Sequence, residues 1–235
     1  MLKKIILVFT FFSFFSCGEL QQIVNQLPQE TTTVGNLDIA KGLQEALQLG
    51  IDKQVTKLTA TNGFYKNELV KIVLPEELQK VDKTLRSIGL GKLADEGLKV
   101  LNRAAEDAVS EATPIFIDAV KGISFTDAKS ILLGADDAAT KYLTKETQTN
   151  LYNKFSPVIN NSFQKVGADK IWKNLITKYN NIPLTNNVNP DLTNYVTQEA
   201  LHGVYKMIAI EEKEIRNKVS SRTTDLLKKV FILQD

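Results

Sequence analysis

The stretch LADEGLKVLNRAAEDAVSEAT, residues 93–113, predicts a helix and indicates how that helix packs. On a wheel of 100° per residue, its small and aliphatic residues share one broad face, made of Ala94, Gly97, Leu98, Leu101, Ala104, Ala105, Ala108, Val109 and Ala112. A wide face of alanine and glycine lets several helices approach closely, so we expect a central helix that starts at about Lys92 and is broken or kinked at Pro114. Its polar residues are expected at the edge or the opposite side, as a solvated surface with local ion pairs. They are Asn102, Arg103, Glu106 and Asp107.

The same helical period continues through the chain after residue 36, and no stretch alternates with a period of two for long enough to demand a sheet. Pro157 should interrupt one helix. Ser124 or Thr126 should cap the helix that begins near residue 126, and Ser220 or Ser221 should cap the last helix. We therefore predict an all-α fold, a single compact domain of about eight to ten helices at residues 37–235. Helices are expected at about 38–59, 65–73, 75–89, 92–113, 114–123, 126–134, 137–155, 168–179, 190–218 and 222–233, with an irregular stretch at 180–190.

The N-terminal segment KKIILVFTFFSFFSCGEL, residues 3–20, contains the only cysteine of the chain, Cys17. Two lysines precede an apolar run at residues 5–15, which is too short to span a bilayer and has the length of a signal-peptide core. With Ser16 before Cys17, the order resembles a bacterial lipoprotein signal, in which cleavage before the cysteine is accompanied by its acylation. An ordinary secretory signal or a short buried helix are the alternatives.

We therefore expect a signal peptide at residues 1–16, an acylated Cys17 carrying chains such as palmitate, and a flexible tether at residues 17–36, which is rich in Gln, Asn and Thr. Two or more acyl chains give stable membrane anchoring. No Asp follows Cys17, so the usual signal for retention in the inner membrane is absent. No acidic run, which would favour export to the cell surface, follows either. The expected location is the periplasmic face of the outer membrane.

The charge balance argues against a nucleic-acid partner. The chain has 29 Lys and Arg and 27 Asp and Glu, and two of the lysines lie in residues 1–16. The 27 remaining basic residues balance the 27 acidic ones, whereas nucleic-acid binding calls for a basic excess on one surface.

Several motifs occur together in the order LNRAAEDA, DAKSILLG, AATKYL, FSPVI, YVTQEALHGVY, IAIEEKEIR and RTTDLLKKVF. They resemble a bacterial family catalogued as domain of unknown function 4197, over about residues 37–231. The resemblance implies an exported, often lipidated protein, and it implies no activity, cofactor or catalytic residue. This chain departs from the family motif ALDG by having His202 in place of the acid.

His202 is the only histidine, and the wheel groups it with Gln198, Lys206 and Lys213 on the polar side of its helix. We expect it to be exposed and dispensable, since a lone surface histidine forms neither a catalytic triad nor a zinc site. With one histidine and no free cysteine, we expect no nitrogen–sulfur metal site. No EF-hand loop or phosphate-binding glycine loop occurs either, and we expect no cofactor.

Two carboxylates on the helix after Pro190 form the one unusual constellation. Glu211 interrupts an apolar arc, and Glu214 lies near its other side. A hard-cation site or an acid–base pair is the functional interpretation. The favoured interpretation is structural: a buried Glu211 paired with Arg222 after a short turn, with Arg216 and Arg103 as reserve partners.

From these residues we expect a lipid-anchored cell-envelope protein with a non-catalytic binding or scaffolding role. Its partner would be an apolar small ligand held between the helices, or another envelope protein. The alternative is a carboxylate-dependent, metal-assisted hydrolase that uses Glu211 and Glu214.

Overall fold

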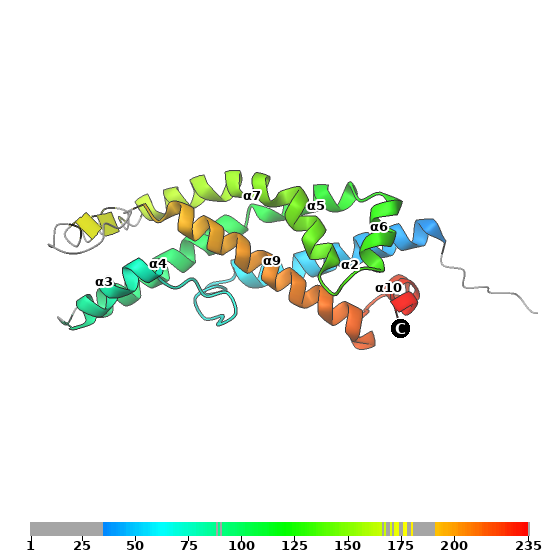
Figure 1. The fold of residues 1–235 in the computed structure, drawn as a ribbon, viewed down its shortest axis with the longest axis horizontal. Coiled ribbons are helices and arrows are strands. Elements are labelled where there is room, and N and C mark those ends of the chain that lie inside the picture. Colours follow the sequence, from blue (N-terminus) through cyan, green and yellow to red (C-terminus); the bar gives the residue numbers. More distant parts are fainter. Residues whose placement is uncertain are drawn as a thin grey trace, which may run out of the picture. The chain divides into compact units, whose positions relative to one another are not determined.

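The computed structural model describes residues 35–87, 89, 91–165, 167, 170, 172–173, 176–177, 180 and 191–234. Within these residues the chain forms eight α-helices, two short 3-10 helices and no strand, so the all-α fold class is confirmed. The α-helices are α2 (Asn36–Thr59), α3 (Glu76–Ser87), α4 (Gly91–Val109), α5 (Ala112–Lys121), α6 (Phe125–Leu132), α7 (Ala138–Lys165), α9 (Thr193–Asn217) and α10 (Asp225–Phe231) (Figure 1). The 3-10 helices are η1 (Val219–Ser221) and η2 (Ile232–Gln234).

The predicted signal peptide at residues 1–16 lies outside the described residues. So do most of the predicted tether at 17–36, of the helix at 168–179 and of the irregular stretch at 180–190. None of the described helices is both long and apolar enough to cross a bilayer.

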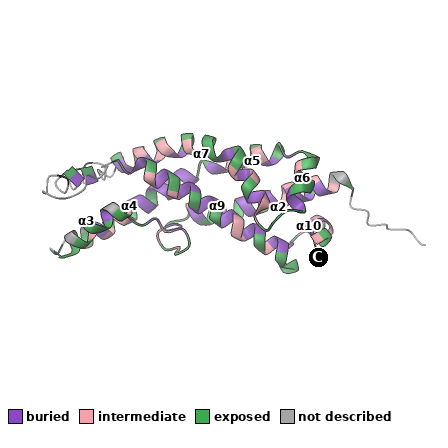
Figure 2. Cartoon of the chain, in the orientation of Figure 1, coloured by how far each residue is buried: buried purple, intermediate pink, exposed green. Residues whose placement is uncertain are grey.

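Helix α4 has the central position that its small residues predict. It contacts α2, α3, α5, α7 and α9, and its alanines at the centre, Ala104, Ala105 and Ala108, are completely buried. Figure 2 shows buried residues along the middle of the helix bundle. Helices α2, α7 and α9 complete the centre of the core, since each packs on at least one of the others. The buried apolar residues of this core all lie between Ile39 and Phe231.

The end of the chain returns to the start of the domain. Helix α10 packs on α2, where a side chain on Gly42 would come within 2.5 Å of Val230. The absence of a side chain at Gly42 lets the two helices approach closely. Lys229 also binds Asp38 at 2.7 Å, so α10 is joined to the first turn of α2.

The segment between α2 and α3 is not the helix predicted at residues 65–73. Asn62 has a positive φ of 64°, which turns the chain away from helical geometry. The backbone N–H of Phe64 then donates to Glu106 at 3.2 Å, while Ile72 exchanges two 2.8 Å hydrogen bonds with the Asn102 side chain. Both partners belong to α4, so tertiary contacts fix this loop in place of a local helix.

Those contacts also correct the predicted solvated edge of α4. Asn102 and Glu106 are buried because they satisfy the backbone of the loop, which covers them. Arg103 does form the expected local ion pairs, with Glu106 at 3.1 Å and with Asp107 at 3.4 Å.

A helix break lies close to Pro114, as predicted, whereas Pro157 does not interrupt its helix. The chain leaves α4 at Val109, before Pro114, and Pro114 lies in the first turn of α5, where a missing N–H is tolerated. Pro157 lies inside α7 and does not end it. Pro157 and Asn153, whose carbonyl would have accepted its N–H, are both exposed, so water can replace that bond.

The helix caps are partly as predicted. Ser124 caps α6 in a capping box with Asp127, which confirms one of the two candidates. The cap of α10 is Thr224, whose hydroxyl accepts from Leu227 at 3.2 Å, and not Ser220 or Ser221. Ser221 instead belongs to η1, which inserts one extra turn between α9 and α10.

Candidate functional site

Glu211 of α9 is buried, as its place in the apolar arc predicts. Only 8% of the residue is exposed. Its carboxylate accepts from Lys53 Nζ at 2.6 Å and from Gln54 Nε2 at 2.7 Å, both on α2. The Lys53 side chain is 64% exposed, so the ion pair lies at the boundary of the core. The contact joins α9 to α2.

Arg222 does not supply the partner that the sequence predicts for Glu211. Its guanidinium donates to the carbonyls of Ile215 at 3.1 Å and Arg216 at 2.8 Å, and it lies 5.8 Å from the centre of the Phe231 ring. The turn formed by η1 explains this position, because it folds Arg222 back under the end of α9. A cation at a helix C-terminus satisfies carbonyls that have no partner within the helix.

Glu214, the second predicted carboxylate, faces a different partner. It pairs with Lys218 at 2.6 Å on the surface of α9 and is 40% exposed. Glu211 and Glu214 therefore engage separate cations, Lys53 on α2 and Lys218 just after α9. In the part of the chain that the structure describes, no group of three or more His, Cys, Asp or Glu side chains is placed to hold a metal ion.

Glu212, which the sequence analysis did not single out, is the most heavily bonded carboxylate of α9. It accepts the N–H of Ala139 at 2.9 Å, the N–H of Thr140 at 2.8 Å and the Thr140 hydroxyl at 2.8 Å. These amides belong to the first turn of α7, where backbone N–H groups lack partners within the helix and the helix dipole favours an anion. Glu212 thus caps α7 from a distant part of the chain.

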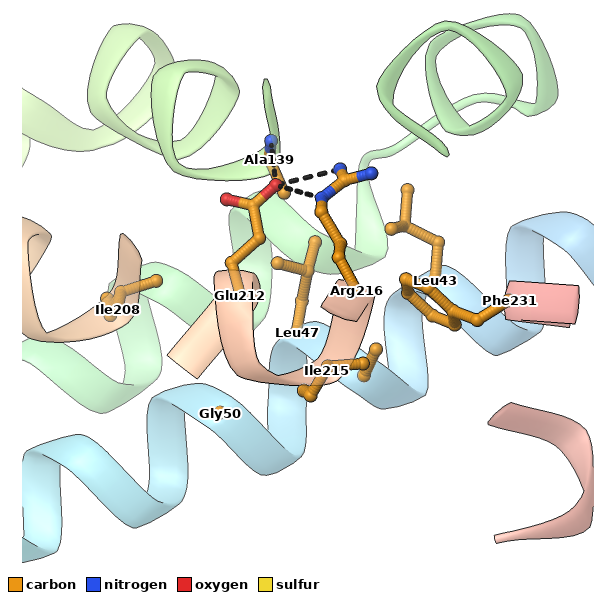
Figure 3. A pocket seen from close by; sticks show the side chains of 10 residues that line it. Leu43, Leu47, Gly50, Ala139, Ile208, Glu212, Ile215, Arg216 and Phe231 are labelled. Atoms are coloured by element: carbon orange, nitrogen blue, oxygen red, sulfur yellow. Dashed lines mark hydrogen bonds and ion pairs between the residues drawn. The ribbon is translucent and has the colours of Figure 1, made fainter. Parts of the chain in front are cut away.

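Arg216 completes this arrangement at the end of another helix. It binds Glu212 through Nε at 2.9 Å and through one terminal nitrogen at 2.8 Å (Figure 3). It also donates to the carbonyls of Ile131 at 2.9 Å and Leu132 at 3.0 Å, at the C-terminal end of α6. The Glu212–Arg216 pair therefore fastens α9 to both helix ends that flank the α6–α7 turn. Its only signal in the sequence is the four-residue spacing, which is usually a surface pair.

A small cavity lies beside the Glu212–Arg216 pair, between α2, α9 and α10. Its walls are mainly aliphatic, with Leu43, Leu47, Ile208 and Phe231 among them (Figure 3). Its volume is about 20 Å³. That is room for a single water molecule, far below the volume of an acyl chain or a cofactor.

His202 is exposed, as predicted, in an open groove of about 630 Å³ between α7 and α9. Tyr205 closes the floor of this groove, with its hydroxyl 2.8 Å from Thr147 and its ring edge-on to Phe116 at 5.9 Å. Burial raises the pKa of Tyr205 to about 12. The tyrosine therefore stays protonated and serves as a packing residue.

A second open groove, which we call the α5–α7 groove, has a volume of about 690 Å³. Its floor is half-buried and apolar, and its rim is exposed and polar. Burial, followed by the charge of Glu146, raises the pKa of Tyr142 above its ordinary value. The floor contains Ile115, Ala119 and Tyr142, and the rim carries Asp118, Glu146, Asn150, Asn153, Lys154 and Pro157.

Cys17, the predicted acylation site, lies outside the described residues.

A family model described as "Protein of unknown function (DUF4197)" matches residues 33–232. No curated protein and no solved structure was found to match the chain.

Proposed function

The chain belongs to the DUF4197 family of proteins of unknown function, and from that premise we propose that it is a lipid-anchored, non-catalytic binding protein of the cell envelope. Its helical domain holds a segment of a partner protein in the α5–α7 groove. Acylated Cys17 keeps the domain at the periplasmic face of the outer membrane.

The observation that carries this proposal is the difference in volume between the enclosed cavity and the open α5–α7 groove. The cavity with aliphatic walls has room for one water, whereas the open α5–α7 groove has about 690 Å³. Binding sites for compact ligands commonly measure about 300–1,000 Å³. A ligand is therefore held on the surface of the helices, and the version of the function with an apolar ligand enclosed in the core is not the one we propose.

The chemistry of the groove selects the class of partner. Ile115, Ala119 and Tyr142 offer an apolar floor, which an apolar side chain covers. The rim has two acids, Asp118 and Glu146, and one lysine, Lys154. Glu146 also pairs with Lys145 at 3.6 Å, so Asp118 is the acid that most favours a cation beside that side chain. A protein segment with one large apolar residue flanked by Lys or Arg fits both features.

The buried charges of α9 support a non-catalytic role. Glu211, Glu212 and Arg216 each bind groups on neighbouring helices or helix ends, which accounts for their burial in structural terms. The order of lysines, apolar run, Ser16 and Cys17 supports the anchor. Acylation provides the stable attachment that an envelope scaffold requires.

Site-specific photo-crosslinking in a diderm bacterium tests the groove. A photoreactive phenylalanine replaces Tyr142, and the matched control replaces Tyr152, a half-buried tyrosine ten residues later on α7 that lines no part of the groove. We expect one protein adduct at residue 142 and none at residue 152. Mass spectrometry of the adduct should locate the cross-link beside an apolar residue with a basic neighbour.

Charge reversal provides the second arm. Asp118→Lys combined with Glu146→Lys should remove the adduct at residue 142 while leaving the helical circular dichroism unchanged, because both side chains are exposed. Equal adducts at residues 142 and 152, or an adduct that survives charge reversal, would contradict the groove as a binding site. The anchor is tested separately: a palmitate analogue should label the wild-type chain and not Cys17→Ser.

A further inference from the structure

Large apolar side chains are exposed unevenly over the domain. Four of them belong to segments at one end, and we call this set the apolar end: Leu133, Val219, Ile232 and Leu233. Their exposed fractions lie between 47% and 62%. Single exposed apolar residues are ordinary, but a group of them on one part of a surface marks an interaction site.

Contacts between the segments that carry these four residues place them in the same region of the domain. The Gln234 side chain of η2 binds the carbonyl of Leu132, next to Leu133. Arg222, which follows η1, lies over the Phe231 ring, next to Ile232. Through these contacts the C-terminal turn of α6 lies next to η2, and the residue after η1 lies next to the end of α10, which itself contacts η2.

The chain enters the domain at this same end. The first turns of α2 lie beside α10 (Figure 1) and are joined to it by the Lys229–Asp38 ion pair of 2.7 Å. Gly35, directly before α2, is 18 residues after Cys17 in the sequence. The sequence predicts a flexible tether there, and a flexible chain of 18 residues has an average span of about 20–25 Å. With that tether, an acylated Cys17 keeps the entry point of the domain, and with it the apolar end, close to the bilayer surface.

We infer that the apolar end docks on the lipid bilayer and inserts its exposed side chains at the membrane interface. This inference rests on the anchor of the proposed function, and it adds an orientation: the domain lies with α10 and η2 against the membrane. Tethering raises the effective concentration of such a weak surface contact to the millimolar range, so a few apolar side chains suffice.

The charges around the apolar end indicate how it binds. Lys228 pairs with Asp225 at 3.1 Å, and Lys218 pairs with Glu214 at 2.6 Å. Because these lysines are balanced by acids, attraction to anionic headgroups contributes little. Docking therefore depends on apolar insertion, and we expect it to change little with salt or with the fraction of anionic lipid.

The absence of a second cysteine makes a labelling experiment direct. The full-length acylated chain is purified with Ile232→Cys or Leu133→Cys, labelled with an environment-sensitive fluorophore and reconstituted in phosphatidylcholine vesicles containing phosphatidylglycerol. Leu69→Cys and Val73→Cys are matched controls, with exposed fractions of 50% and 54% on the loop before α3. Quenching is measured with aqueous iodide and with nitroxide-bearing lipids.

We expect the labels on Ile232→Cys and Leu133→Cys to be quenched by the nitroxide lipids and to be at least threefold less sensitive to iodide than the labels on the two loop controls. Adding Ile232→Glu and Leu233→Glu to the Leu133→Cys chain should restore iodide quenching, while circular dichroism confirms the fold.

The possible failures are distinguishable. A chain that stays in the supernatant and takes the label on Cys17 overturns the anchor. A chain that is anchored but quenched by iodide equally at residues 232, 133, 69 and 73 overturns the docking alone. Shielding that appears without vesicles and rises with protein concentration would assign the apolar end to a second copy of the chain, and would likewise refute docking on lipid.

Discussion

Replacing Glu212 by alanine should destabilise the domain more than replacing any other acid of α9. The substitution removes a buried carboxylate that accepts two backbone N–H groups of α7, the Thr140 hydroxyl and two nitrogens of Arg216. After the change, the first turn of α7 loses its cap. Arg216 keeps its two carbonyl partners on α6 and loses its counter-charge.

The magnitude follows from the burial of these groups. Removing one member of a buried ion pair usually costs about 3–5 kcal/mol, because the remaining charge is left uncompensated. Each buried donor left without a partner costs about 1–3 kcal/mol, and these contributions overlap. We therefore expect Glu212→Ala to lower the free energy of unfolding by about 3–5 kcal/mol.

Two neighbouring acids provide internal controls. The sequence predicts a buried Glu211–Arg222 pair, but the partner of Glu211 is Lys53, which is 64% exposed and regains water when the pair is lost. Glu211→Ala should therefore cost only about 1–2 kcal/mol, mainly from the buried amide of Gln54. Glu214→Ala, on the surface, should stay within about 0.5 kcal/mol of the wild type.

Urea unfolding followed by circular dichroism at 222 nm measures all three variants, with equal m-values as the check for two-state behaviour. A double variant, Glu212→Ala with Arg216→Leu, should be less destabilised than the sum of its single changes, because no buried charge is left alone. A loss of less than about 1 kcal/mol for Glu212→Ala, or a larger loss for Glu211→Ala, would refute the structural role assigned to the Glu212–Arg216 pair.

Four further changes test other parts of the structure. Asn102→Ala should cost about 2–4 kcal/mol in urea unfolding, since the buried N–H and carbonyl of Ile72 both lose their partner; an unchanged midpoint would contradict this role. Hydrogen bonds from the Ser124 hydroxyl and backbone lower the pKa of Asp127 below its ordinary 3.8, so its stabilising effect is present above that pH and lost as the pH falls through the lowered pKa. The melting temperatures of wild type and Asp127→Asn should accordingly differ at pH 7 and converge in acid; a constant difference would argue against the cap. The raised pKa of Tyr205 means that its contribution is complete below pH 10 and is lost as the pH rises through about 12, so absorbance at 295 nm should show a late ionisation that is missing in Tyr205→Phe. Because His202 is exposed, His202→Ala should shift the free energy of unfolding by no more than about 0.5 kcal/mol. A larger loss would show that its side chain stabilises the domain.

Local patterns were sufficient for most helices. The helices predicted at 38–59 and 190–218 correspond to α2 and α9, whose apolar residues recur at helical spacing. Ser124 was a correct cap because capping involves only residues three positions apart. The same patterns identified the small-residue face of α4 and the burial of Glu211, since both depend on the composition of one helix.

Long-range contacts account for the errors. Residues 65–73 have a helical pattern, but their backbone binds Asn102, 30 residues away, which also reverses the predicted exposure of Asn102. Pro157 was predicted to interrupt its helix because proline removes one hydrogen bond, yet packing along the rest of α7 outweighs that local loss.

The sequence by itself determined that the described chain is helical, where most helices begin and end, and which faces are apolar. These properties depend on residues within one or two turns of each other. Only the tertiary structure decided the partners of the buried charges: Glu211 binds α2 over separations of 157 and 158 residues, and Glu212 caps α7 from 73 residues away. A helical wheel shows that a carboxylate is turned inward, but the donor that meets it belongs to another helix. That donor is set by how the helices pack.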